Sequence, residues 1–219
     1  AIALLESRRA LATNDSAIGQ ALGARYGRLA DHASRRGDQD KAKELHRKAI
    51  DILTAVFEQG PDDGQARLSL VRGLNQKAAY QAHSKQNRAA LKSYARAAEL
   101  SNELGEDAQR TRLITLGNHA QLLGRLDRIR KARKVAKGAL ELAEKLKSQP
   151  VPSPRAVTDL ASAELRYARL LRSEPQGQIR RAKKMAQTAL TRLEQAQGKP
   201  NARQKSLMKG LKALISELR

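Results

Sequence analysis

The sequence contains no cysteine, no tryptophan, and only one phenylalanine and four tyrosines among its 219 residues. Without cysteine the chain has no disulfide, no thiolate metal ligand and no cysteine nucleophile. A β-sandwich or β-barrel core would need more aromatic and β-branched side chains than this. The interior must therefore come from alanine and leucine, which are strong helix formers.

Long apolar runs are missing as well. No stretch of about 18 apolar residues could span a bilayer, and the first residues lack the basic-then-apolar order of a signal peptide. The 40% of hydrophobic residues are instead spread periodically, which indicates a folded chain. Because the sequence opens without Met inside an apolar helical pattern, we expect it to be a piece of a larger protein.

The charge is strongly one-sided. Lys and Arg number 43 against 22 Asp and Glu, which gives a formal net charge of +21. Residues 1–110 contribute +4 and residues 111–219 contribute +17. An electrostatic partner should therefore prefer the second half of the chain.

Four segments of the sequence align without gaps, and each carries two alanines seven residues apart. Seven residues are close to two helical turns, so both alanines lie on one stripe and let a neighbouring helix approach closely. The first alanines are 48, 42 and 50 residues apart, which is a repeat period. The pairs are Ala42 and Ala49, Ala90 and Ala97, Ala132 and Ala139, and Ala182 and Ala189.

The helix-turn-helix unit with small residues at set places resembles the tetratricopeptide repeat (TPR) family. In the first unit, large, small and turn positions of that family are taken by Tyr26, Leu29, Ala30, Gly37, Ala42 and Ala49. The resemblance implies an all-α, α-α superhelix: a TPR-like solenoid of about four extended repeats with a C-terminal capping helix. We predict the end of a preceding repeat at 1–14, repeats at 16–60, 62–105, 106–149 and 154–198, and the capping helix at 201–219.

A narrower resemblance rests on the order of residues within the units. The phrase RLADHASRRGD at 28–38 is similar to the repeat arrays that follow the catalytic domain of large bacterial serine/threonine protein kinases. The sequence itself has no Gly-rich loop, no V-A-I-K lysine, no H-R-D and no D-F-G. The resemblance thus implies a non-catalytic region of a bacterial, cytoplasmic kinase.

Catalytic and metal-binding patterns are absent. The four histidines form no H-E-x-x-H, and no phosphate-binding loop occurs, so we expect no enzyme activity, no metal and no cofactor. His46 is expected to pack in the core. The paired acids Asp62–Asp63 and Glu106–Asp107 stand at predicted helix starts, where capping is the simpler role. Gly19, Gly23 and Gly27 predict a tight helix crossing, with a ligand-hugging groove as the alternative.

The TPR resemblance also implies a binding surface, because ligand peptides of that family lie along the concave face made by the first helices. Asn and Arg there would hydrogen-bond a peptide backbone and a carboxylate. The predicted partner-binding residues are Arg28, Arg35, Arg72, Asn75, Asn118, Gln121 and Arg125.

Clusters of cations are the sharpest feature of the second half. They stand at Arg128, Arg130, Lys131, Arg133, Lys134 and Lys137 and, one unit later, at Arg180, Arg181, Lys183 and Lys184. A solvated helix face would explain them, as would an acidic protein partner, nucleic acid or an anionic membrane surface. The scarcity of aromatics disfavours nucleic acid. We therefore predict a protein-protein interaction scaffold with an acidic protein or peptide partner, or self-association, and keep a nucleic-acid or anionic-surface module as the alternative.

Overall fold

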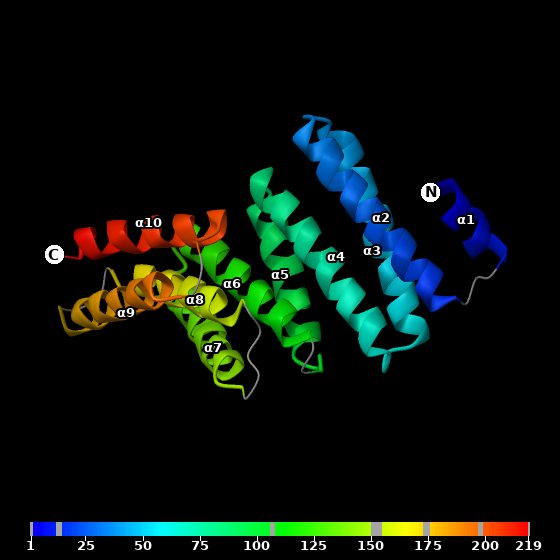
Figure 1. Cartoon of the computed structure of the whole chain (residues 1–219). Helices are drawn as coiled ribbons and strands as arrows, with labels where there is room; N and C mark the ends of the chain where they lie inside the picture. The colour runs from blue at the N-terminus through cyan, green and yellow to red at the C-terminus, as the bar shows by residue number, and fades with distance from the viewer. Residues whose placement is uncertain are drawn as a thin grey trace. The chain divides into compact units, whose positions relative to one another are not determined.

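A computed structural model describes residues 2–11, 15–105, 108–149, 155–172, 176–196 and 199–218, with the backbone alone at 8–11, 176 and 177. These residues form ten helices and no strand, which confirms the all-α prediction (Figure 1). The helices are α1 (Ile2–Leu11), α2 (Ser16–Arg35), α3 (Gln39–Gln59), α4 (Gly64–His83), α5 (Asn87–Ser101), α6 (Gln109–Arg125), α7 (Ile129–Lys147), α8 (Ala156–Leu170), α9 (Gln176–Glu194) and α10 (Ala202–Glu217).

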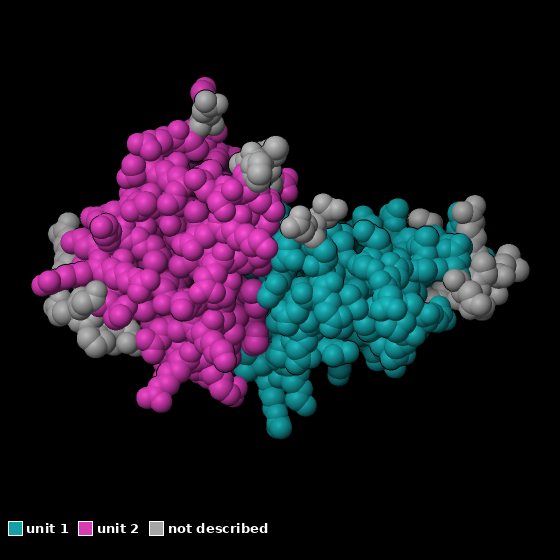
Figure 2. Space-filling view, turned by 90° about the horizontal axis from the view of Figure 1, so that it is seen from below, with its two compact units in different colours: residues 1–115 teal, residues 116–219 magenta. Residues whose placement is uncertain are grey.

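The chain divides into two compact units, residues 1–115 (unit 1) and residues 116–219 (unit 2), coloured separately in Figure 2. In unit 1, α2 packs against α3 and α4 against α5, while α4 also contacts α2 and α3. In unit 2, α8 packs against α7, α9 and α10. The predicted repeat boundaries at 14, 106, 154 and 198 lie outside the described residues and stay a prediction.

The paired alanines lie where the helices meet. All eight are buried, and none exposes more than 3% of its surface. A methyl group fills little space, so the backbones on either side approach more closely than leucine would allow. The predicted packing stripe is therefore confirmed.

Glycines on α2 and α4 leave room for a leucine of α3. Leu53 of α3 lies between Gly23 of α2 and Gly73 of α4. A Cβ at position 23 would come 2.5 Å from Leu53 Cγ, and a Cβ at position 73 would come 2.7 Å from Leu53 Cδ1. The tight crossing predicted for this glycine series is thus confirmed at Gly23.

The turns between the two helices of a pair share one geometry. Gly37, Lys85 and Asp127 have positive φ, at 86°, 59° and 55°. The N–H of the next residue then donates to the carbonyl five residues back, as Asp38 does to Ala33 at 3.0 Å. Gln86 and Arg128 repeat this bond to Gln81 and Leu123. Each left-handed residue thereby ends the first helix and sets the start of the second.

Short polar side chains begin several helices. Asp15, Asp38 and Asp63 each accept a backbone N–H of the first turn, and Asn201 forms a reciprocal capping box with Gln204. Hydrogen bonds from the backbone N–H groups of Ala66 and Gln65 lower the pKa of Asp63. The capping role is confirmed for Asp63, whereas Glu106–Asp107 lies outside the described residues.

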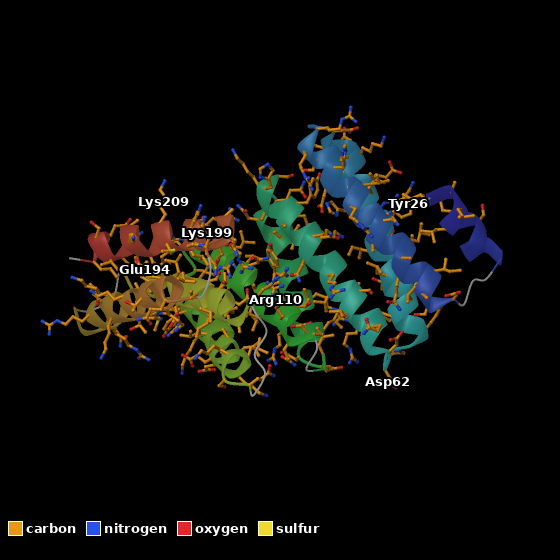
Figure 3. The ribbon with its side chains drawn as sticks, in the orientation of Figure 1. Tyr26, Asp62, Arg110, Glu194, Lys199 and Lys209 are labelled. Atoms are coloured by element: carbon orange, nitrogen blue, oxygen red, sulfur yellow. The ribbon has the colours of Figure 1, made fainter. Side chains whose placement is uncertain are left out.

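The first unit buries one histidine. His46 is 2% exposed, and its ring lies 4.9 Å from that of Tyr80, so the predicted packing role is confirmed. Burial, helped by the charge of Lys77, lowers the pKa of His46 to about 4. Nearby, Tyr26 reaches from α2 toward α1 and donates to Glu6, and this bond with burial raises the pKa of Tyr26 to about 12 (Figure 3).

In the second unit, α8 is buried on nearly every side and carries two acids inward. Asp159 pairs with Arg203 of α10 at 3.0 Å, and Glu164 pairs with Arg192 of α9 at 2.7 Å. Burial raises the pKa of Glu164, and Arg192 opposes that shift. Both pairs satisfy charges that would otherwise be costly to bury.

The Leu53 contact predicts that Gly23→Ala destabilises unit 1. Alanine favours helix by about 1 kcal/mol, yet its methyl would strike Leu53, which Gly73 confines from the other side. We expect a net loss of about 1–3 kcal/mol in the free energy of unfolding, measured in urea.

Gly138→Ala is the matched control, because a Cβ there meets nothing within 4 Å. It should stabilise the protein by about 1 kcal/mol. Equal effects of the two substitutions would contradict the packing assignment.

The buried histidine predicts a pH-dependent stability. Since its pKa is about 4 when folded and about 6.5 when unfolded, the unfolded chain takes up the proton first as the pH falls. The free energy of unfolding should therefore drop between pH 6.5 and pH 4, by about 3 kcal/mol at full effect. In urea unfolding, the His46→Gln variant should lose less free energy of unfolding over this pH range than the original protein. Parallel pH curves for the two proteins would refute the role of His46.

Candidate functional site

A cleft of about 450 Å³ in unit 2 gathers four arginines. Its lining comes from the C-terminal part of α8 with Arg172 just after it, from the C-terminal part of α6 and from the first residue of α7. Ala120, Ile129 and Leu170 add apolar surface to this lining. The lining residues are Ala120, Gln121, Gly124, Arg125, Ile129, Arg166, Arg169, Leu170 and Arg172.

Two of these arginines rest against glycines. The Arg166 guanidinium occupies the place that a Cβ of residue 117 would take on α6. On α10, a Cβ at Gly210 would come 3.2 Å from Arg169 Nη2. Both guanidinium groups thus lie close to a helix at a glycine, where a side chain would leave them less room.

The arginines of the cleft differ in their charge partners. Arg172 Nη1 lies 2.9 Å from Glu217 Oε2, and both side chains are exposed. Within the described part of the chain, neither Arg125 nor Arg169 has a carboxylate partner. Arg125 and Arg169 therefore contribute no ion pair to the described part of unit 2.

Two of the seven predicted partner-binding residues lie together here. Gln121 and Arg125 of α6 line the cleft, whereas the half-buried Asn118 is not part of its lining. Arg28 and Arg35 on α2 and Arg72 on α4 are exposed residues of unit 1.

Asn75, the remaining predicted residue, is engaged inside unit 1. Its Nδ2 donates to Thr115 Oγ1 at 2.7 Å, and the Thr115 hydroxyl donates in turn to the Thr111 carbonyl. Its Oδ1 is buried, with no hydrogen-bond partner among the described residues. The side chain therefore links α4 to α6.

Sequence reasoning missed three of the four arginines. Arg166 and Arg169 are three residues apart on α8, which brings them to one side of that helix, and Arg172 follows two residues after the helix ends. That R-x-x-R-x-x-R pattern was the available signal. The sequence does not show which side of α8 is buried, because several buried residues of this helix are polar and interrupt its amphipathic pattern.

The basic clusters of the second half lie on α7 and α9. Eight of their ten cations are exposed, and Arg133 and Lys183 are half-buried. Arg128, Arg130 and Lys131 surround the start of α7, where the helix dipole is already positive, so their charge does not stabilise the helix.

The described residues contain no metal-ligand cluster and no helix suited to span a membrane. No group of three His, Cys, Asp or Glu side chains could hold a metal ion there. None of the helices in those ranges combines the length and apolar character that a membrane span requires.

The comparisons with known proteins concern the fold. No protein-family model and no curated protein matches the sequence. BtubC (BKLC) from P. vanneervenii is 22% identical with a TM-score of 0.72, over 97% of this chain and 79% of that one. A variant of a protein described as a Podosopora anserina kinesin light chain with TPR-like repeats is 12% identical (TM-score 0.67), over 91% and 87%.

The yeast histone chaperone Hif1, a scaffold protein, is also similar. It is 12% identical with a TM-score of 0.56, over 91% of this chain and 96% of that one. These likenesses extend over nearly the whole chain and agree with its ten helices. The chain therefore has an all-α, TPR-like solenoid fold.

Proposed function

We propose that this chain is a non-catalytic protein-interaction scaffold whose arginine cleft in unit 2 binds an acidic segment of a partner protein. The observation that carries the proposal is the gathering of Arg125, Arg166, Arg169 and Arg172 in one cleft. An arginine guanidinium donates two parallel hydrogen bonds to a carboxylate, and Gln121 can hydrogen-bond a peptide backbone.

The surroundings of the cleft support an acidic partner. Residues 116–219 carry 24 Lys and Arg against 8 Asp and Glu, a formal charge of +16. Such a field accelerates encounter with an acidic chain, while the cleft supplies the short-range contacts. Ala120, Ile129 and Leu170 offer apolar surface to a neighbouring aliphatic side chain.

The remaining predicted contacts belong to the same proposal. Arg28, Arg35 and Arg72 are exposed on unit 1 and would offer further guanidinium groups to an acidic partner, and self-association would use the same chemistry with an acidic stretch of a second copy. Hif1 is described as a scaffold that recruits protein complexes to core histones. That description supports a scaffold role in general for this fold.

The kinase context is a further part of the proposal, and it rests on the phrase at 28–38. The coding sequence upstream of Ala1 tests it directly. We expect a Gly-rich loop, a V-A-I-K lysine, H-R-D and D-F-G there, and an upstream region with none of these would contradict the assignment.

A nucleic-acid or anionic-surface module is the second candidate. The exposed cations of α7 and α9 favour it, because those around the start of α7 oppose the helix dipole. Such binding would be sequence-independent, and its affinity would fall steeply with salt.

Charge reversal in the cleft tests the first candidate. We expect Arg125→Glu with Arg169→Glu to weaken binding of a fluorescein-labelled oligoglutamate peptide at least about tenfold, because two charge-assisted contacts become repulsive. Fluorescence anisotropy at constant ionic strength measures the affinity.

The matched control is Lys134→Glu with Lys145→Glu, which changes the net charge equally at two exposed positions of α7. The control should retain most of the affinity. If both double variants lose affinity alike, binding is a diffuse property of the basic surface and the cleft has no special role.

A further inference from the structure

We infer that the exposed side of α9 binds double-stranded DNA in the major groove, where its amides and hydroxyls contact base edges and its cations contact phosphates. The inference rests on the second candidate function, because it names the nucleic acid and the helix that would contact it. The arginine cleft takes no part in it.

A polar stripe runs along α9 on the side opposite its buried residues. The helix packs against α8 and α10, and Ala182, Ala186, Ala189 and Leu193 are buried. Five residues of the stripe, together with Arg192, line a hollow of about 380 Å³. The exposed residues of this α9 stripe are Arg180, Lys184, Gln187, Thr188, Thr191 and Gln195.

The first part of the stripe is basic and carries unpaired charge. Arg180, Arg181 and Lys184 are exposed, and none of them forms an ion pair within the described ranges. The sequence of α9 contains no acidic residue before Glu194, which pairs with Lys212 of α10 at 3.3 Å. The positive charge at this end of the stripe is therefore available to a polyanion.

The basic helix α7 differs from α9 in this respect. Its exposed residues include Glu141 and Glu144, and Glu141 pairs with Lys137 at 3.5 Å. The second half of α7 thus mixes both signs of charge on its surface. Of the two basic helices, α9 is the one suited to a polyanion.

The uncharged part of the stripe has no role in the described fold. Threonine is a weaker helix former than alanine, because its branched side chain loses rotamer freedom in a helix, yet Thr188 and Thr191 are exposed. The side chains of Gln187, Thr191 and Gln195 form no hydrogen bond to other described residues. Base edges would satisfy them, because glutamine bonds adenine in two places and threonine contacts the thymine methyl group.

The length of the stripe suits the major groove. From Arg180 to Gln195 the chain rises about 22 Å at 1.5 Å per residue, which corresponds to about six base pairs of 3.4 Å each. Gln195 directly follows the helix, and its backbone N–H still donates to the Thr191 carbonyl at 2.9 Å. The groove is about 12 Å wide and admits one α-helix.

Other anionic partners fit the stripe less well. A helix that lies on a membrane inserts an apolar face, which this side of α9 lacks. Single strands stack their bases on aromatic side chains, and none of the residues that line the hollow in the described structure is aromatic. The major groove of duplex RNA is too narrow for side chains to read. An acidic peptide would explain the cations but not the uncharged amides beside them.

The binding test compares a labelled DNA duplex of random sequence with single-stranded DNA and duplex RNA of equal length. We expect the whole chain to bind the DNA duplex at least about tenfold more tightly than either competitor, measured by fluorescence anisotropy at constant salt. Repeated selection from a random duplex library should then enrich one motif of about five or six base pairs, the length that the stripe covers.

Variants of the cations test the phosphate contacts. Arg180→Ala with Lys184→Ala should weaken binding of the selected and the random duplex alike. It should also reduce the slope of log affinity against log salt concentration by about two, since each phosphate contact contributes about 0.9. Lys145→Ala with Lys147→Ala is the matched control, because it removes two exposed cations at the end of α7. The control should leave the slope nearly unchanged.

Variants of the uncharged residues test the base contacts. Gln187→Ala should weaken binding of the selected duplex at least about fivefold while binding of the random duplex changes little. Thr191→Ala should lower the preference for the selected duplex and raise the thermal stability, because alanine is the better helix former. Gln65→Ala, which removes an exposed amide of unit 1, should change neither quantity.

The outcomes separate this inference from the functions on which it builds. If duplex DNA binds but selection enriches no motif and the Gln187 and Thr191 variants bind like the original protein, the inference fails and the second candidate function stands. If duplex DNA does not bind, both fail, while binding of an acidic peptide in the cleft is untouched. Tighter binding of single-stranded DNA or duplex RNA would overturn the choice of ligand.

Discussion

The close approach of helix backbones at alanine and glycine is the constraint on which the rest of this structure depends. Ala42, Ala90, Ala97 and Ala182 are fully buried at helix contacts, and Leu53 fits between two glycines. Large side chains at these contacts would separate the helices, so the scarcity of aromatic residues follows from the architecture. The same constraint leaves the long cationic side chains to the surface and to the cleft. There, Gly117 gives Arg166 its position on α6.

Features set by local chemistry could be predicted from the sequence. The alanine spacing predicts the packed stripe, and the position of Asp63 after a Gly-Pro break predicts a helix cap. Both features depend only on residues within two helical turns. The turn at Gly37 was recognisable by its glycine. Lys85 and Asp127 adopt the same left-handed conformation without being glycine, so the sequence does not show that the three turns have one geometry.

Features set by contacts between distant segments could not be predicted in this way. Helix α8 is buried on nearly all sides, and Asp159 and Glu164 lie inside it because Arg203 and Arg192 come from other helices. No stripe on α8 alone reveals that environment. The cleft depends on the same tertiary contacts, since Arg166 and Arg125 meet only when α8 packs beside α6. The sequence therefore predicted Gln121 and Arg125 but not the arginines that complete the site.

The proposed function depends on the difference between the cleft and the basic patches of α7 and α9. Cations on an exposed helix face attract any anion, whereas guanidinium groups fixed in a cleft select by shape and charge. Nuclear magnetic resonance of the arginine side-chain Nε–Hε groups during titration with an oligoglutamate peptide tests this most directly. The account predicts that the signals of Arg125, Arg166, Arg169 and Arg172 shift first and saturate. Uniform, unsaturated shifts spread over the arginines of α7 and α9 would contradict it.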